Sequence, residues 1–184
     1  MHARFRFAPL LLALLFTGAA AKADDGGMTD SGPVIDGYGP TYGIPDRDVA
    51  LPADFKFRAV FDAATYAGKT SSLNTTLVSA ARYLNMHARN GVAVENMQLA
   101  VVIHGAAVRS ILNSESHNER YDEENPNLEL VTRLHEAGVK FYVCGQSLTF
   151  GGFNKNELVP EAKVALSAMT MLTVLQSEGY ALLP

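Results

Sequence analysis

The sequence contains a single cysteine, Cys144, which stands where an apolar run ends. Residues 139–143 are rich in β-branched and aromatic side chains, which is typical of a strand buried on both faces of a sheet. Gly145 follows directly and allows the backbone to turn sharply beside the thiol. A helical turn after this glycine would aim unpaired N–H groups at Cys144 and favour the thiolate. Two interpretations stay open at this point, a working thiol and a buried structural cysteine.

His104 holds a comparable position after the strongest predicted strand, residues 97–103. Reacting groups in an open α/β sheet gather outside the carboxyl ends of the strands, so neighbouring strands would bring His104 and Cys144 to one rim. A nearby imidazolium lowers the pKa of a thiol, and such a pair supports nucleophilic or sulfur-transfer chemistry. A structural, hydrogen-bonded histidine is the alternative. We expect four neighbours to line the substrate rim: Gly105, Gly145, Gln146 and Ser147.

Motifs for metals and cofactors are missing from the sequence, which has neither CxxC nor HExxH. Cys144 and His104 could form a soft two-ligand copper site, but we expect no metal and no cofactor. A flavin would be compatible with the fold class alone. The turn at residues 63–70 is not a clear phosphate cradle, because the first glycine of a P-loop would fall at Ala63.

Five strands are predicted, and each of the first four is followed by a helical or turn segment. The strands are expected over residues 55–62, 97–103, 139–143, 162–166 and 180–183, and the helices over 73–90, 106–112, 125–137 and 167–178. This alternation predicts a three-layer α/β sandwich, with about five mostly parallel strands and helices on both faces. Asp62 and Ser167 then join His104 and Cys144 near strand ends.

The remaining histidines have weaker signals. His87 and His135 fall within amphipathic helices and are expected at the surface. His117 falls in a polar, charged segment, residues 113–124, which is expected to be a loop.

The first 23 residues have the pattern of a secretory signal peptide. Arg4 and Arg6 precede an apolar segment, and Ala21-Lys22-Ala23 resembles a cleavage site. Cleavage near Ala23 would leave a periplasmic or secreted protein with no membrane span. The formal net charge of −4 argues against a nucleic-acid-binding protein. A single cysteine cannot form an internal disulfide.

Residues 24–54 form a leader rich in Gly, Asp and Pro, ahead of an α/β domain expected over residues 55–184. Such a composition cannot bury enough apolar surface to fold independently. The leader therefore either packs across the domain or a neighbouring subunit, or is a flexible linker.

Several segments together resemble the DsrE/DsrF-like family, and specifically its exported branch. They are Gly138–Leu148, Val101–Ala107, Asn125–Asn127, Ser167–Thr170 and Gln176–Leu182, and the resemblance spans about Gly37 to Pro184. It implies a small flavodoxin-like fold that forms dimers, trimers or hexamers. It also implies that Cys144 matches the cysteine that carries sulfur as a persulfide in cytoplasmic relatives. The signal peptide and the leader depart from those relatives.

Three hypotheses follow. The first is a sulfur carrier, or sulfurtransferase-like protein, with Cys144 as the persulfide-forming thiol, His104 as its neighbour and a sulfur-relay protein as partner. The second is a non-enzymatic oligomeric module that binds a small ligand or a protein and has a structural cysteine. The third is a metal or redox-stress protein. A homo-oligomer is expected because Phe150 and Phe153 flank glycines beside the cysteine segment; alternatively, these rings fold back onto their own core.

Overall fold

A single parallel sheet organises the chain, in a computed structural model that describes residues 32–183. Its strands pair in the order β4-β3-β2-β1-β5, and every neighbouring pair is parallel. The strands are β1 (Phe57–Ala63), β2 (Met97–Ile103), β3 (Lys140–Cys144), β4 (Ala162–Ala165) and β5 (Ala181–Leu183). The predicted signal peptide at residues 1–23, and the leader up to residue 31, lie outside the described residues.

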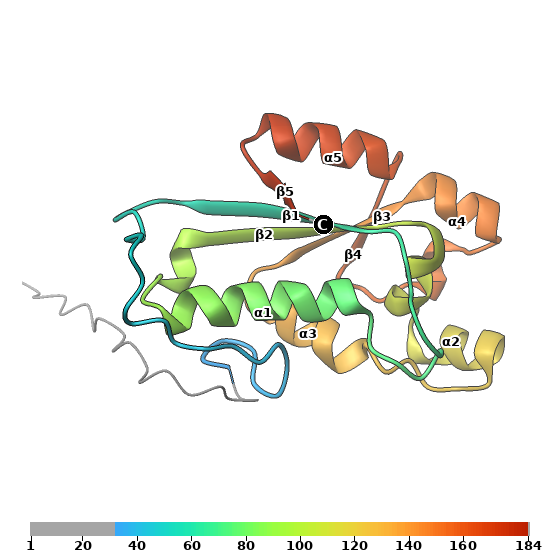
Figure 1. Cartoon of the computed structure of the whole chain (residues 1–184). Helices are drawn as coiled ribbons and strands as arrows, with labels where there is room; N and C mark the ends of the chain where they lie inside the picture. Colours follow the sequence, from blue (N-terminus) through green and yellow to red (C-terminus); the bar gives the residue numbers. More distant parts are fainter. Residues whose placement is uncertain (1–31, 184) are drawn as a thin grey trace, which may run out of the picture.

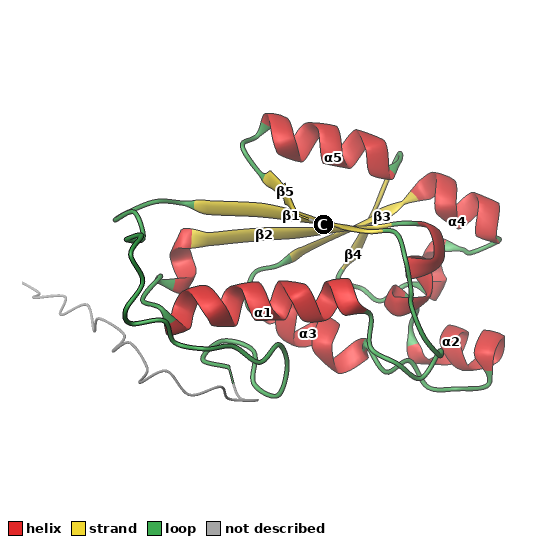
Figure 2. Cartoon of the chain, in the orientation of Figure 1, coloured by secondary structure: helices red, strands yellow, loops and turns green. Residues whose placement is uncertain are grey.

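Helices cover both faces of this sheet, as the alternating pattern predicted. The α-helices are α1 (Thr75–Arg89), α2 (Ser114–Tyr121), α3 (Leu128–Glu136), α4 (Gly145–Gly151) and α5 (Ala168–Ser177). Three short 3₁₀ helices complete the set, η1 (Val94–Asn96), η2 (Gly105–Ile111) and η3 (Lys155–Glu157). In Figure 1, α1 and α3 lie side by side below the sheet and α5 lies above it. The three-layer α/β architecture is therefore confirmed (Figure 2).

The handedness of the connections explains why α5 lies alone on its face. The connections from β1 to β2 and from β2 to β3 run along the sheet in one direction, whereas the connection from β4 to β5 runs back across it. A right-handed crossover puts its helix on one face for the first direction and on the opposite face for the second. The cysteine strand, β3, therefore has α3 below it and α5 above it.

Two hydrophobic clusters of unequal size follow from this layering. The larger lies between the sheet and the pair α1 and α3, and includes Ile103 and Phe141. The smaller lies beneath α5 and includes Val60, Val102 and Cys144. Strand β2 is covered on both faces, which accounts for its nearly continuous apolar sequence.

The prediction of a loop over residues 113–124 is wrong, because this segment contains α2. The side chain of Asn113 caps the helix by accepting a hydrogen bond from the Ser116 N–H, and Asp122 ends it in a left-handed conformation. Its polar composition concealed a buried face on which His117 has no exposed surface. The Nδ1 of His117 lies 2.7 Å from the carbonyl oxygen of Glu123.

His87 also departs from the expected surface position, whereas His135 is exposed as predicted. The His87 ring is half-buried and stacks on Tyr83, with ring centroids 4.0 Å apart. Burial lowers the pKa of His87, although the hydrogen bond to the Tyr83 carbonyl opposes this effect. Phe57 packs edge-on against the same imidazole.

The described part of the leader packs on α1 through Asn85, whose side chain has no exposed surface. Its Oδ1 accepts hydrogen bonds from the N–H groups of Val34 and Ile35. Its Nδ2 donates to the carbonyl oxygens of Ile35 and Tyr38. One helix side chain therefore satisfies the backbone of a whole leader turn.

The leader also approaches α1 closely at Gly39, where φ is +62°. A Cβ atom there would lie only 2.4 Å from the backbone nitrogen of Arg82, so this position requires glycine. Further along, Asn90 accepts a hydrogen bond from the Ile44 N–H and donates one to the Tyr42 carbonyl. Residues 32–44 thus form a strap on α1.

Candidate functional site: the Cys144 rim

Cys144 is the last residue of β3 and the N-cap of α4. The helix begins at once because Gly145 can pass close to the next strand. A Cβ atom on Gly145 would lie 2.8 Å from the carbonyl oxygen of Ala165 on β4. The predicted strand, glycine and helical turn are therefore all present, and they place the thiol at the carboxyl edge of the sheet.

Hydrogen-bond donors from two helices converge on the Cys144 sulfur. Burial raises the pKa of the thiol, but the donors outweigh burial and hold this pKa below its ordinary value. They are the Ser147 hydroxyl and the backbone N–H groups of Ser147, Ala168 and Gln146. The Ser147 nitrogen lies 3.4 Å from Sγ. Because Ala168 is the first residue of α5, the start of each helix contributes to stabilising the thiolate.

The thiol has little contact with solvent, since Cys144 is only 5% exposed. Its neighbours in the smaller hydrophobic cluster include Ala168 and Val102. Burial of this kind is also typical of a structural cysteine. The donors around the sulfur, however, are not the surroundings of an inert apolar thiol, whose pKa would be raised.

His104 lies on the same rim and forms an ion pair with Asp62. The Nε2 of His104 is 2.7 Å from Oδ1 of Asp62, and these side chains are 28% and 35% exposed. The donors that lower the pKa of Cys144 come from Gln146, Ser147 and Ala168. The groups that lower the thiol pKa are therefore helix N–H groups and a hydroxyl, and His104 is not among them.

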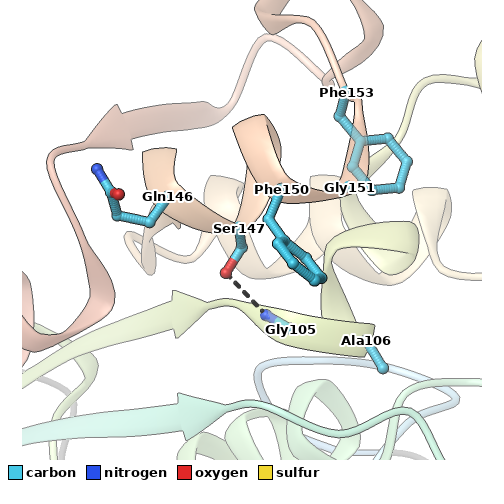
Figure 3. Close-up of a pocket in the computed structure, with 7 residues that line it drawn as sticks. All are labelled: Gly105, Ala106, Gln146, Ser147, Phe150, Gly151 and Phe153. Atoms are coloured by element: carbon cyan, nitrogen blue, oxygen red, sulfur yellow. Dashed lines mark hydrogen bonds between the residues drawn. The ribbon is translucent and has the colours of Figure 1, made fainter.

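Ser147 connects the residues predicted for the rim. Its Oγ accepts a hydrogen bond from the Gly105 N–H at 3.1 Å, while its hydroxyl and N–H donate to Cys144. Figure 3 shows Ser147 pointing from α4 toward Gly105, and Gln146 extending away from Gly105. Gln146 reaches the thiol through its backbone N–H and leaves its side chain in solvent.

An apolar hollow of about 500 Å³ opens beside Ser147. It is lined by residues of η2 and α4 and by the segment that follows α4: Gly105, Ala106, Gln146, Ser147, Phe150, Gly151 and Phe153. The Phe150 ring, which lies at this hollow in Figure 3, is 96% exposed. Phe153 is half-buried, with the Arg120 guanidinium 4.4 Å from its ring centroid. Of the two phenylalanines, only Phe150 is strongly exposed.

Clusters of side chains that commonly bind a metal ion are absent from the described residues. Across residues 32–183, no group of three or more His, Cys, Asp and Glu side chains could hold one. Over the same range, no helix is both long enough and apolar enough to cross a membrane.

The sequence placed Asp62, His104 and Cys144 near strand ends, but it predicted neither the pairing of Asp62 with His104 nor the donor at Ala168. The pairing of Asp62 with His104 depends on the register of β1 and β2, which side-chain types do not reveal. The sequence signal for Asp62 was a lone carboxylate near the end of a strand whose centre is buried. The donor at Ala168 comes from the backbone, so its side chain carries no signal at all.

Comparisons with known protein families and solved structures found matches to this chain. The DsrE/DsrF-like family profile matches residues 56–184. A protein of unknown function, MTH1491 from Methanobacterium thermoautotrophicum, has a similar structure, with a TM-score of 0.50 and 19% sequence identity. The similarity covers 69% of this chain and 97% of that one, and it supports the fold. No curated protein matches the chain. The chain belongs to the DsrE/DsrF-like family.

Proposed function

We propose that this protein is a sulfur carrier, or sulfurtransferase-like protein, in which Cys144 forms the persulfide. The DsrE/DsrF-like family is associated with sulfur relay. The observation that carries the proposal is the set of donors around the Cys144 sulfur, which lowers the thiol pKa despite burial. The thiolate is the nucleophilic form of cysteine, so these donors favour attack on an electrophilic sulfur.

Thiosulfate illustrates the chemistry proposed for this site. The Cys144 thiolate attacks the outer, sulfane sulfur of thiosulfate and forms a new S–S bond. The bond between the two thiosulfate sulfurs breaks, and sulfite leaves with its electron pair. The product is a deprotonated persulfide, and the same donors that face the thiolate can stabilise its charge. Attack by an acceptor thiolate on the outer sulfur would then pass that sulfur on and regenerate Cys144.

Intact mass spectrometry of the purified protein tests this proposal. After incubation with thiosulfate or polysulfide, the chain should gain one sulfur atom, and a reductant should remove it. The Cys144→Ser variant is the matched control and should gain none. A variant that still accepts sulfane sulfur would show that Cys144 is not the carrier.

A second function is favoured by the low exposure of Cys144 and by the apolar hollow beside Ser147. Here the protein is a non-enzymatic module that binds a small ligand or a protein, and the cysteine is structural. The Cys144→Ser variant would then bind normally, whereas replacing the leader tyrosines Tyr38 and Tyr42 would weaken binding. A wild-type thiol that resists both sulfane sulfur and small alkylating agents would favour this function.

Export and self-association complete the proposal. The signal-peptide pattern at residues 1–23 supports a periplasmic or secreted protein, and the mass of the mature chain tests cleavage near Ala23.

The exposed Phe150 ring supports a homo-oligomer or a contact with a sulfur-relay partner protein. Light scattering of wild type and Phe150→Ser tests the first of these, since the variant should have the smaller mass.

A further inference from the structure

Three neighbouring strands, β1, β2 and β3, each place a polar side chain on one face of the sheet, at its carboxyl edge. Val60, Val102 and Cys144 all belong to the cluster beneath α5. Side chains alternate between the faces of a strand, so Asp62 and His104, each two residues further along, lie on that same face. The face beneath α5 therefore ends in a carboxylate, an imidazole and a thiol.

The backbone of His104 continues the line of β2 and stays hydrogen-bonded to β1. The His104 N–H donates to the Ala63 carbonyl at 2.9 Å, and its φ and ψ of −153° and 177° are extended. The last registered pair of β2 and β3 is Ile103 with Val143, and extending this register by one residue sets His104 beside Cys144. Neighbouring strands lie about 4.8 Å apart, which makes the imidazole and the thiol adjacent along the rim.

The ion pair determines which imidazole nitrogen can exchange a proton. An ionised carboxylate only accepts hydrogen bonds, so the 2.7 Å contact with Asp62 requires a hydrogen on Nε2 of His104. In the neutral ring Nδ1 is then the free base. A carboxylate that orients a histidine beside a nucleophile is the general arrangement of an activated nucleophile.

We propose that Asp62 is a positioning residue that holds His104 as the proton relay of Cys144. This inference rests on the sulfur-carrier function proposed above, and its donor is an organic persulfide. The thiol proton passes to Nδ1 of His104, directly or through one water, and leaves the Cys144 thiolate. The thiolate attacks the sulfane sulfur of the donor, the donor S–S bond breaks, and the donor leaves as a thiolate. The imidazolium, paired with Asp62, returns the proton to that leaving thiolate.

The Asp62→Asn variant tests the relay with two separate measurements. An asparagine amide can donate to Nε2, so the neutral ring should change to the tautomer with hydrogen on Nδ1, which ¹⁵N NMR of the histidine ring detects. Sulfur uptake from a small organic persulfide should slow at least about tenfold, because general acid–base catalysis contributes about 10²–10⁴. Asp62→Glu, which restores a carboxylate, should recover most of the rate.

Glu119→Gln provides the control for net charge, since it removes a carboxylate from the exposed side of α2. Its rate should equal that of wild type. An Asp62→Asn rate within twofold of wild type, or an unchanged His104 tautomer, would overturn the positioning role while leaving the carrier function standing. A wild-type protein that takes up no sulfur would overturn the carrier function itself, and the relay with it. If Asp62→Asn does not fold, Asp62→Glu and His104→Ala are compared instead. A sulfur-uptake rate of Asp62→Glu as low as that of His104→Ala would overturn the positioning role of Asp62.

Discussion

Replacing Asn85 by alanine tests whether the leader is an integral part of the fold. The Asn85 side chain is fully buried and makes four short hydrogen bonds to leader backbone groups, at 2.7–3.1 Å. Alanine would leave two N–H groups and two carbonyls without these partners. Each unsatisfied buried group costs about 1–3 kcal/mol, which gives at least about 4 kcal/mol if the leader stays in place.

Detachment of the leader is the alternative to leaving these groups unsatisfied. If the strap leaves α1, its backbone groups reach water, but the burial of Ile35 is lost, so detachment costs at least about 2 kcal/mol. We therefore expect Asn85→Ala to lower the free energy of unfolding by about 2–4 kcal/mol. For a chain of this size the melting temperature should fall by roughly 4–16 °C. Chemical denaturation measures the first quantity and thermal melting the second.

Asn90→Ala is the matched control, because Asn90, the residue that caps the C-terminal end of α1, also binds the leader but its hydrogen bonds are exposed. Water replaces exposed partners, so this variant should lose about 1 kcal/mol or less. Limited proteolysis should cut the leader of Asn85→Ala faster than that of Asn90→Ala. Equal stability losses in the two variants would refute the reasoning that burial makes the Asn85 clamp strong.

Three further predictions concern the rim. Ser147→Ala removes a hydrogen-bond donor to Cys144 and the acceptor of the Gly105 N–H. The pKa of the Cys144 thiol should therefore rise, and its alkylation at neutral pH should slow roughly 3- to 10-fold. An unchanged alkylation rate would contradict this prediction. Because the folded pKa of Cys144 is lowered, the unfolded chain binds more protons between the two pKa values. The free energy of unfolding of wild type and of Cys144→Ser should be measured by denaturation across pH. The stabilisation from the Cys144 thiolate should be present above about pH 8.5 and lost as pH falls through the folded pKa. A stability difference between the two proteins that does not change with pH would refute this prediction. Gly145→Ala forces a Cβ to 2.8 Å from the Ala165 carbonyl oxygen and should lower the free energy of unfolding by about 1–3 kcal/mol, as measured by denaturation. A variant as stable as wild type would show that Gly145 does not approach β4 so closely.

The sheet could be predicted from sequence because its strands carry strong local patterns. Residues 97–103 were predicted as a strand with the bounds that the structure shows, since this strand is apolar on both faces. The helix α2 could not be recognised in the same way. Its eight residues bury only Ser116 and His117, so its sequence has the polarity of a loop. Its capping residue, Asn113, is equally common in turns.

The rim could be predicted only in part. The positions of Cys144 and His104 at strand ends follow from where the apolar runs stop. The partner of each group depends on tertiary structure. Ala168 is a donor because α5 crosses back over the sheet to start above the thiol, and Asp62 meets His104 through strand register.

The pH dependence of Cys144 alkylation tests the central claim most directly. A small uncharged alkylating agent, applied to the folded protein and followed by intact mass, reports both access to the sulfur and its ionisation. Donors that outweigh burial should give a complete reaction with its inflection below the pKa of an ordinary thiol, about 8.5. A thiol that does not react, or whose inflection lies at or above that value, would contradict the account and identify Cys144 as a structural residue.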